Sequence, residues 1–333
     1  MGLIMILSSS IFMLQVAIAT ERPIIGILCD EIDNNPSRSF ISASYVKAVE
    51  ASGARVVPIF LSRNYDYYKR MVDSVNGILL PGGKALESTV GGYFDAARHI
   101  FNYTRQLHEK GAHFPLLGIC LGMQALAEFS TEDYDNSNST LERCSGVNGR
   151  MLPLKMTQSF RNSSLYGNIT PQIYDILTKQ NVTANYHRYC IRPDKNLTLP
   201  WHILSLNVDR ERKQFISSME LPGPIAGIQF HPEKNAWEWN QEHAAFEDAL
   251  LASRHFYDWL VIEARKNNHT FDDIQNEDDS LIYNYDAIYL GREQIYRFES
   301  TSTSQRLIPG QLLAIISCLL PLIVINNKYS TIR

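Results

Sequence analysis

The residue in this sequence most suggestive of chemistry is a cysteine that lies between two glycines. Cys120 follows an apolar run, with Gly118 two residues before it and Gly122 two residues after it, and a helix-forming stretch comes next. Glycines at this spacing allow a tight strand-to-helix turn that projects the central side chain from a strained backbone. At the start of a helix the dipole favours a thiolate, and the N–H of Leu121 is placed to bind an oxyanion. This pattern predicts a catalytic thiol, and the alternative is a buried structural cysteine.

A histidine and a glutamate offer the acid and base chemistry that a thiol nucleophile needs. In GIQFHPE, a strand-like run delivers His231 at its end, and Glu233 follows two residues later. Open α/β folds gather their functional side chains at the carboxyl ends of the strands, so both residues are expected to meet Cys120 there. Cys120 would attack a carbonyl, His231 would accept and then donate the proton, and Glu233 would fix the imidazole tautomer. A structural histidine at a strand end is the alternative.

A third pattern is the pair of glycines after another strand-like run. Pro81-Gly82-Gly83 directly follows the apolar residues GILL. A backbone this flexible can turn an N–H toward the reacting carbonyl and complete an oxyanion hole. The alternative is an ordinary turn.

The elements that must position these residues alternate between strand and helix from Pro23 onward. Expected strands are Ile24–Cys29, Ala54–Phe60, Gly77–Leu80 and Pro115–Ile119, and expected helices are Phe40–Ser52, Tyr65–Ser74, Tyr93–Lys110 and Met123–Phe129. Such alternation predicts an α/β fold with a mostly parallel central sheet and helices on both faces.

The second half of the chain has a different pattern. The polar stretch Ser130–Asn148 is expected to be a loop or insertion, and short apolar runs such as Trp201–Val208 and Lys213–Met219 predict additional mixed or antiparallel strands. A final apolar run leads into His231, and Trp239–Asn267 is expected to form one helix.

Composition excludes several classes of protein. Among 333 residues, 31 Lys and Arg against 35 Asp and Glu give a formal net charge of −4, which argues against nucleic-acid binding. With 45% hydrophobic and 20% charged residues the chain is globular rather than disordered or collagen-like. The cysteines are too few for a disulfide scaffold; they are Cys29, Cys120, Cys144, Cys190 and Cys318. If one of the first four is a working thiol, at most one bridge can form among the other three.

Both ends of the chain are apolar. Residues 1–19 close on Ala17-Ile18-Ala19 and predict a secretory signal peptide, with a membrane anchor or buried helix as the alternative. Residues 307–325 are just long enough to cross a membrane, and a lipid-anchor signal or a processed tail are the alternatives. Between the ends we expect a folded domain, residues 20–298, and a linker, 299–306; a polar tail, 326–333, follows the apolar segment.

Acceptor triplets for N-glycosylation lie only between the two apolar ends. They are Asn102, Asn138, Asn162, Asn168, Asn181, Asn196 and Asn268. Together with a signal peptide, they predict a glycosylated lumenal or extracellular domain.

The motifs LLGICLGMQALA, GIQFHPEK and LLPGG resemble those of the class I glutamine amidotransferase-like superfamily. RPIIGIL, TANYHRYCI, HPEKNAWEW and EARKNNH are similar to segments of one of its branches, the folate γ-glutamyl hydrolases. The resemblance extends from Pro23 to about Gly291. It implies an enzyme of the secretory pathway, either in a lysosome or vacuole or outside the cell, and a homodimer.

The resemblance also implies roles for individual residues. Cys120 would be the nucleophile, His231 the base and acid, and Glu233 the orienting carboxylate, with the N–H groups of Gly83 and Leu121 forming the oxyanion hole. His187, in TANYHRYCI, would contact substrate, although a surface histidine is the alternative. Gln124 matches the amidotransferase pattern where animal hydrolases carry an acidic residue, so a substrate contact there is expected to differ.

The candidate residues predict a thiol hydrolase, and the resemblance implies that it cuts γ-glutamyl amide bonds, with folylpoly-γ-glutamates as the expected substrates, through a γ-glutamyl thioester. The reaction needs no metal and no organic cofactor. Membrane attachment through residues 307–325 is expected. The alternatives are a hydrolase or glutaminase acting on other γ-glutamyl amides, and a catalytically inactive membrane-tethered binding protein.

Overall fold

The computed structural model describes residues 20–85, 89–131, 140–238, 246–291 and 293–299. The chain divides into a unit that ends at Phe298 and a C-terminal unit, of which only Glu299 is described. The predicted signal peptide and the apolar segment 307–325 lie outside the described residues. None of the helices within the described ranges is long and apolar enough to cross a membrane.

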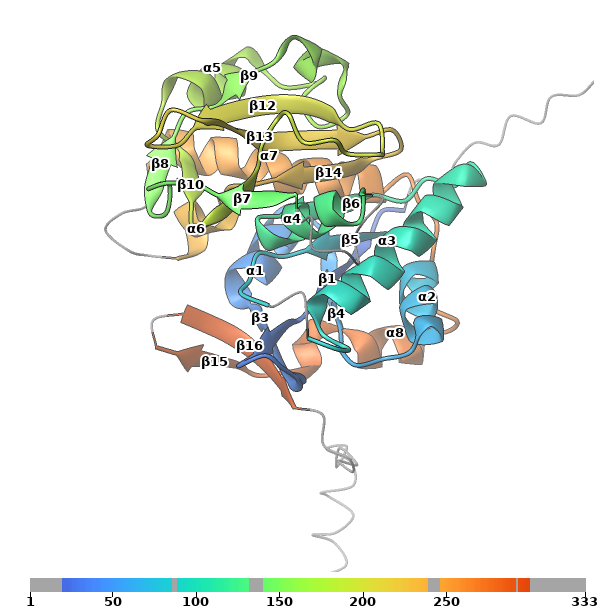
Figure 1. Cartoon of the computed structure of the whole chain (residues 1–333). Coiled ribbons are helices and arrows are strands. Elements are labelled where there is room, and N and C mark those ends of the chain that lie inside the picture. Colours follow the sequence, from blue (N-terminus) through green and yellow to red (C-terminus); the bar gives the residue numbers. More distant parts are fainter. Residues whose placement is uncertain (1–19, 86–88, 132–139, 239–245, 292, 300–333) are drawn as a thin grey trace, which may run out of the picture. The chain divides into compact units, whose positions relative to one another are not determined.

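An eight-stranded sheet forms the centre of the first unit (Figure 1). In spatial order its strands are β4 (Arg55–Ile59), β1 (Ile24–Leu28), β5 (Gly77–Leu80), β6 (Leu116–Ile119), β14 (Ile225–Ile228), β13 (Gln214–Leu221), β12 (His202–Val208) and β9 (Lys155–Met156). The first five strands are parallel, and the last three add antiparallel pairs. Strands β1, β5, β6 and β14 are buried along their whole length, as in a sheet that is covered on both faces.

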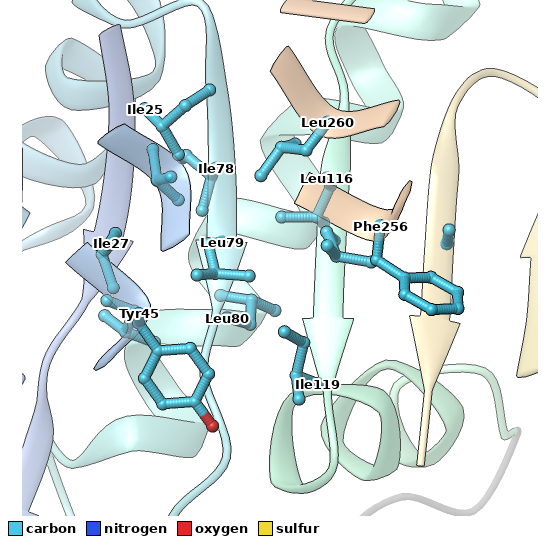
Figure 2. Close-up of a cluster of buried hydrophobic side chains, with 14 of the residues drawn as sticks. Ile25, Ile27, Tyr45, Ile78, Leu79, Leu80, Leu116, Ile119, Phe256 and Leu260 are labelled. Atoms are coloured by element: carbon cyan, nitrogen blue, oxygen red, sulfur yellow. The ribbon is translucent and has the colours of Figure 1, made fainter. Parts of the chain in front are cut away.

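Helices form two groups that pack against this sheet (Figure 1). The first group is α2 (Tyr65–Ser74), α3 (Tyr93–Glu109) and α4 (Leu121–Glu128), and the second is α1 (Ala43–Ala51), α5 (Pro171–Lys179), α6 (Pro232–Trp237) and α7 (Glu247–Ala264). Figure 2 shows aliphatic side chains of β1, β5 and β6 lying together with Phe256 and Leu260 of α7. The prediction of a mostly parallel α/β sheet with helices around it is therefore confirmed.

A second sheet, of four strands, was absent from the expectations. Its order is β15 (Ala287–Leu290), β16 (Glu293–Glu299), β3 (Asn35–Ser42) and β2 (Asp30–Ile32). The helix expected to begin at Phe40 therefore begins at Ala43, because Phe40 pairs with Asp30 in the β2–β3 hairpin. Residues 40–42 are too few for a period of 2 to be distinguished from one of 3.6.

Two further expectations need correction. The stretch Ser130–Asn148 contains β7 (Leu141–Arg143), which pairs with β11 (Tyr189–Ile191) and is therefore more than a loop. The helix expected from Trp239 begins at Glu247, where two acidic residues occupy the first turn and complement the helix dipole. The remaining elements are β8 (Arg150–Leu152), β10 (Thr183–Asn185), α8 (Ile274–Ser280) and the 3₁₀ turns Gln158–Asn162 and Ile282–Asn284.

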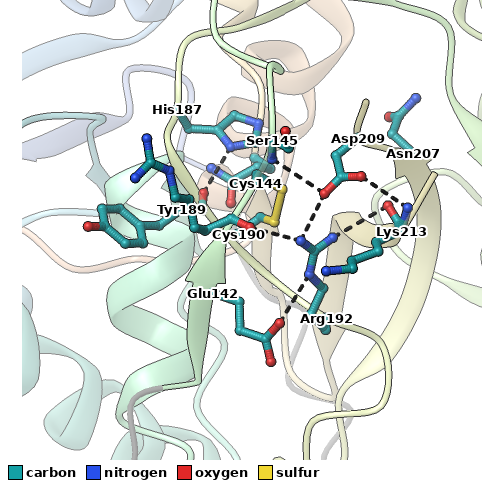
Figure 3. Close-up of a disulfide and its surroundings, with 12 residues drawn as sticks. Glu142, Cys144, Ser145, His187, Tyr189, Cys190, Arg192, Asn207, Asp209 and Lys213 are labelled. Carbon is teal, nitrogen blue, oxygen red and sulfur yellow. Dashed lines mark hydrogen bonds and ion pairs between the residues drawn. A yellow bond between two sulfur atoms is a disulfide. The ribbon is translucent and has the colours of Figure 1, made fainter. Parts of the chain in front are cut away.

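A disulfide joins Cys144 to Cys190, which lies in β11 (Figure 3). At most one bridge was expected if one of the first four cysteines is a working thiol, and this bridge leaves Cys29 and Cys120 as the free thiols of the described residues. The buried Arg192 stabilises the same region, because its Nη2 donates to Asp209 Oδ2 at 2.9 Å.

Replacing both bridged cysteines with alanine is expected to lower the free energy of unfolding by about 2–4 kcal/mol. The bridge closes a loop whose ends are 46 residues apart and so restricts the unfolded chain. Urea unfolding of the double variant and the parent measures the difference, and a reducing agent should move the parent toward the variant. Coincident unfolding curves for the two proteins would contradict this expectation.

Candidate active site

The carboxyl ends of four adjacent parallel strands carry the candidate site. The residues of interest that follow them are Asp30 after β1, Pro81 after β5, Cys120 after β6 and His231 after β14, each within three residues of the strand end. Because these strands are neighbours in the sheet, segments far apart in the sequence meet at one edge.

Cys120 occupies a strained turn between β6 and α4. Its backbone has φ 52° and ψ −101°, which non-glycine residues rarely adopt. A Cβ at Gly122 would lie 2.2 Å from the carbonyl oxygen of Leu80, and one at Gly118 would lie 2.7 Å from the carbonyl carbon of Gly122. Both glycines are therefore needed for the close packing, and the turn has the strained conformation that their spacing predicts.

His231 lies between Cys120 and Glu233. Its Nδ1 is 2.6 Å from Glu233 Oε1. A Cβ at Gly82 would lie 2.5 Å from His231 Cε1 and 3.2 Å from the Cβ of Cys120, so the imidazole and the thiol lie against the same glycine. The N–H of His231 donates to the carbonyl of Ala184 in β10 at 2.8 Å, which holds the backbone at the strand end. All three residues are buried: Cys120 is 5% exposed, His231 6% and Glu233 1%. The structure thus brings the three predicted side chains together at one edge of the sheet.

Charges within this group determine the protonation of the histidine. Burial by itself lowers the pKa of His231, but the charges of Glu233 and Cys120 outweigh burial and raise it to about 10. Burial raises the pKa of Glu233, but the adjacent imidazolium outweighs it, so the net pKa is lowered. His231 is consequently cationic and Glu233 anionic over the range from weakly acidic to weakly basic pH.

Two tyrosines that the sequence did not single out complete the surroundings of His231. The Tyr45 hydroxyl, from α1, lies 3.2 Å from His231 Nδ1, and the Tyr257 hydroxyl, from α7, donates to Glu233 Oε2 at 3.3 Å. Both tyrosines are buried residues of their helices, and no sequence motif marks a tyrosine at such a position. The one available signal was the apolar periodicity of the two helices, which predicts burial but not contact with the site.

The loop after β5, residues 81–84, is held by hydrogen bonds that leave one backbone donor free. These bonds run from the Tyr93 hydroxyl to the Pro81 carbonyl (2.7 Å), from the Gly82 N–H to the Tyr45 hydroxyl (2.9 Å), and from the Lys84 N–H to Asp30 Oδ2 (3.1 Å). The Gly83 N–H has no partner among the described residues. A Cβ at Gly82 would lie 3.2 Å from the Cβ of Cys120, so the loop passes directly beside the thiol.

Gln124 and His187 converge on a single carbonyl group. Gln124 Nε2 and His187 Nδ1 each lie 2.9 Å from the Tyr189 oxygen, and His187 Nε2 lies 3.1 Å from Asn185 Oδ1 (Figure 3 shows His187 and Tyr189). Burial lowers the pKa of His187 to about 4, and the charge of His231 adds to this effect. Both nitrogens of this buried imidazole already have protein partners, so substrate contact by His187 or Gln124 stays a prediction.

A model of the peptidase C26 family matches residues 23–233, which is well over half of the sequence. The chain belongs to the peptidase C26 family.

Curated relatives of this peptidase C26 member have one activity in their names. The mouse γ-glutamyl hydrolase is 35% identical over 297 residues, covering 84% of this chain and 90% of the mouse protein. The rat γ-glutamyl hydrolase is 36% identical over 296 residues, with the same coverage. γ-Glutamyl hydrolase B of Dictyostelium discoideum is 33% identical over 302 residues and covers 86% of each chain. The resemblance to γ-glutamyl hydrolases inferred from the motifs is therefore confirmed.

Proposed function

We propose that this peptidase C26 member is a thiol hydrolase that cleaves γ-glutamyl amide bonds, with folylpoly-γ-glutamates as its substrates. The observation that carries the proposal is the convergence of Cys120, His231 and Glu233 at the edge of the sheet, where the imidazole hydrogen-bonds Glu233 and lies with the thiol against Gly82. The names of the curated relatives support the γ-glutamyl bond as its target. The proposal that the substrate contains folate rests on the resemblance of the sequence motifs to those of folate γ-glutamyl hydrolases.

The proposed reaction begins with the Cys120 thiolate attacking the γ-carbonyl carbon. A C–S bond forms, and the carbonyl electron pair moves onto the oxygen, where the N–H groups of Gly83 and Leu121 stabilise the negative charge. Collapse of this intermediate breaks the C–N bond, and the departing amine takes its proton from His231. Neutral His231 then accepts a proton from water, whose oxygen attacks the thioester. The second collapse breaks the C–S bond, restores the thiolate and releases the acid.

A substrate panel tests the proposal. The purified protein is incubated with pteroylpoly-γ-glutamate, glutamine and γ-glutamyl peptides, and the products are separated by chromatography. We expect shortened pteroylglutamates together with free glutamate or γ-linked glutamate chains. Ammonia released from glutamine alone would instead indicate a glutaminase, and cleavage confined to γ-glutamyl peptides would indicate another γ-glutamyl hydrolase. Tight binding of pteroylpoly-γ-glutamate without turnover would indicate the binding protein.

We also propose that the enzyme is a glycosylated homodimer of the secretory pathway, tethered to a membrane by residues 307–325. The exposed side chains of the six described sequon asparagines support glycosylation; they are Asn102, Asn162, Asn168, Asn181, Asn196 and Asn268. Asn138 lies outside the described residues. A mass shift on glycosidase treatment, retention in membranes after carbonate extraction, and the sedimentation coefficient of the solubilised protein test these three properties separately.

A further inference from the structure

A buried carboxyl group lies behind the loop that carries the proposed oxyanion donor. Asp30 begins β2, two residues after β1 ends, and it is 4% exposed. Its Oδ2 accepts the N–H of Lys84, and a Cβ at Gly83 would lie 2.3 Å from the same oxygen. Gly82 therefore lies against Cys120 and His231, and Gly83 lies against Asp30.

Because of this contact, the charge of Asp30 can affect the proposed reaction. Gly83 is too close to Asp30 for any side chain to separate them, so the carboxyl group packs directly against the backbone of the oxyanion loop. A negative charge there opposes the negative charge that develops on the substrate oxygen at the Gly83 N–H. A neutral carboxyl group keeps an oxygen that can accept the Lys84 N–H but carries no opposing charge.

We infer that Asp30 is a positioning residue of the proposed hydrolase, whose carboxyl group holds the oxyanion loop and supports catalysis only while it is neutral. The inference rests on the proposed function. It makes Asp30 the group that limits activity on the alkaline side.

The groups around Asp30 are consistent with a carboxyl group that titrates near neutral pH. Burial is the largest influence and raises the pKa of Asp30 to about 7, and the charge of Glu31 also raises it. The N–H groups of Lys84 and Glu31, which donate to Oδ2 and Oδ1, and the charge of Lys84 lower it. Cys29 and Tyr93 also lie near Asp30, and burial raises the pKa of each, so both stay neutral. Asp30 is thus neutral below about pH 7 and anionic above it.

The direction of the pH effect follows from these charges. If the neutral form of Asp30 is the active one, kcat/KM falls as pH rises through about 7. His231 cannot cause a fall in that range, because Glu233 and Cys120 keep its pKa near 10 despite burial, and its imidazolium persists on both sides of neutrality. The titrations of the two groups are therefore separable in a pH profile.

The test is a comparison of pH profiles on pteroylpoly-γ-glutamate for the parent and the Asp30→Asn variant of the full chain. Between about pH 5.5 and about pH 8.5 we expect kcat/KM of the parent to fall roughly tenfold, the effect of one unit charge on another nearby. In Asp30→Asn the ratio of the two values should stay within about twofold, whatever the absolute rate. Asp30→Ser, which also removes the charge, should give the same flat ratio and serves if the asparagine variant folds poorly.

The matched control is Asp95→Asn. Asp95 lies in the first turn of α3, and its Oδ2 accepts the Gly91 N–H at 2.7 Å, so its carboxyl group holds a different backbone segment from the one held by Asp30. This variant should keep the fall between the two pH values. An unchanged fall in both Asp30 variants would overturn the inference while leaving the proposed function intact. Absence of turnover by the parent at every pH would instead contradict the proposed function itself, and the inference with it.

Discussion

Replacing Cys120 with alanine is expected to abolish hydrolysis of γ-glutamyl amides, with a loss of kcat of about 10⁴-fold or more. The variant removes the sulfur that would form the covalent intermediate, and no other group described in the site can take its place. Because the side chain is small and the strained turn depends on Gly118 and Gly122, the variant should fold and bind pteroylpoly-γ-glutamate with an affinity close to that of the parent. Turnover is measured by chromatography, and binding by calorimetry.

Cys29→Ala is the matched control for this variant. Cys29 is the other free thiol of the described residues, and it is buried at the end of β1. Burial raises the pKa of its thiol, so it stays protonated and unreactive, and its loss should change kcat/KM less than about threefold. If Cys120→Ala kept substantial turnover, or if Cys29→Ala lost it, the assignment of the nucleophile would be wrong.

Glu233→Gln is expected to reduce kcat/KM by about 10²–10⁴-fold without unfolding the protein. The charge of Glu233 is a main reason that the pKa of His231 lies above its usual value despite burial. Glutamine removes this charge, so the pKa of His231 should fall, and less of the enzyme will hold the imidazolium that donates a proton to the leaving amine. The residual activity should decline as pH rises through this lowered pKa. Kinetics across pH and an NMR titration of the imidazole measure the two effects.

A remote carboxylate–histidine pair provides the control for Glu233→Gln. Glu263 in α7 has its Oε2 2.9 Å from Nε2 of His113, so Glu263→Gln makes the same chemical change outside the site. This variant should lose some stability and keep the parent pH profile. Equal losses of activity in Glu233→Gln and Glu263→Gln would point to a general effect on folding rather than to a role for Glu233 in orienting His231.

The sequence predicted the parts of the molecule that depend on local patterns. The glycines around Cys120 predicted the turn, because only a residue without a side chain fits against Leu80 and against the helix backbone. The parallel part of the sheet followed from the regular alternation of buried runs with helices. His231 and Glu233 could be placed beside Cys120 because strands that are parallel bring their carboxyl ends to one edge.

The features that were missed depend on contacts between distant segments. Strand β3 pairs with β2 and with β16, and nothing within Asn35–Ser42 shows that partners lie so far along the chain. Tyr45 and Asp30 are ordinary residues within their own segments, and their importance comes from the loop after β5 that packs against them. The pairing of Cys144 with Cys190 was likewise open, because a cysteine count limits the number of bridges but not the partners.

The most direct test of the account is the capture of the covalent intermediate. The parent enzyme is mixed with pteroylpoly-γ-glutamate, quenched in acid within the first turnover, digested and examined by mass spectrometry. We expect the γ-acyl half of the substrate to be attached to the peptide that contains Cys120, and to disappear as hydrolysis is completed. Turnover without any acylated peptide under conditions that preserve thioesters, or acylation of a residue other than Cys120, would contradict the account.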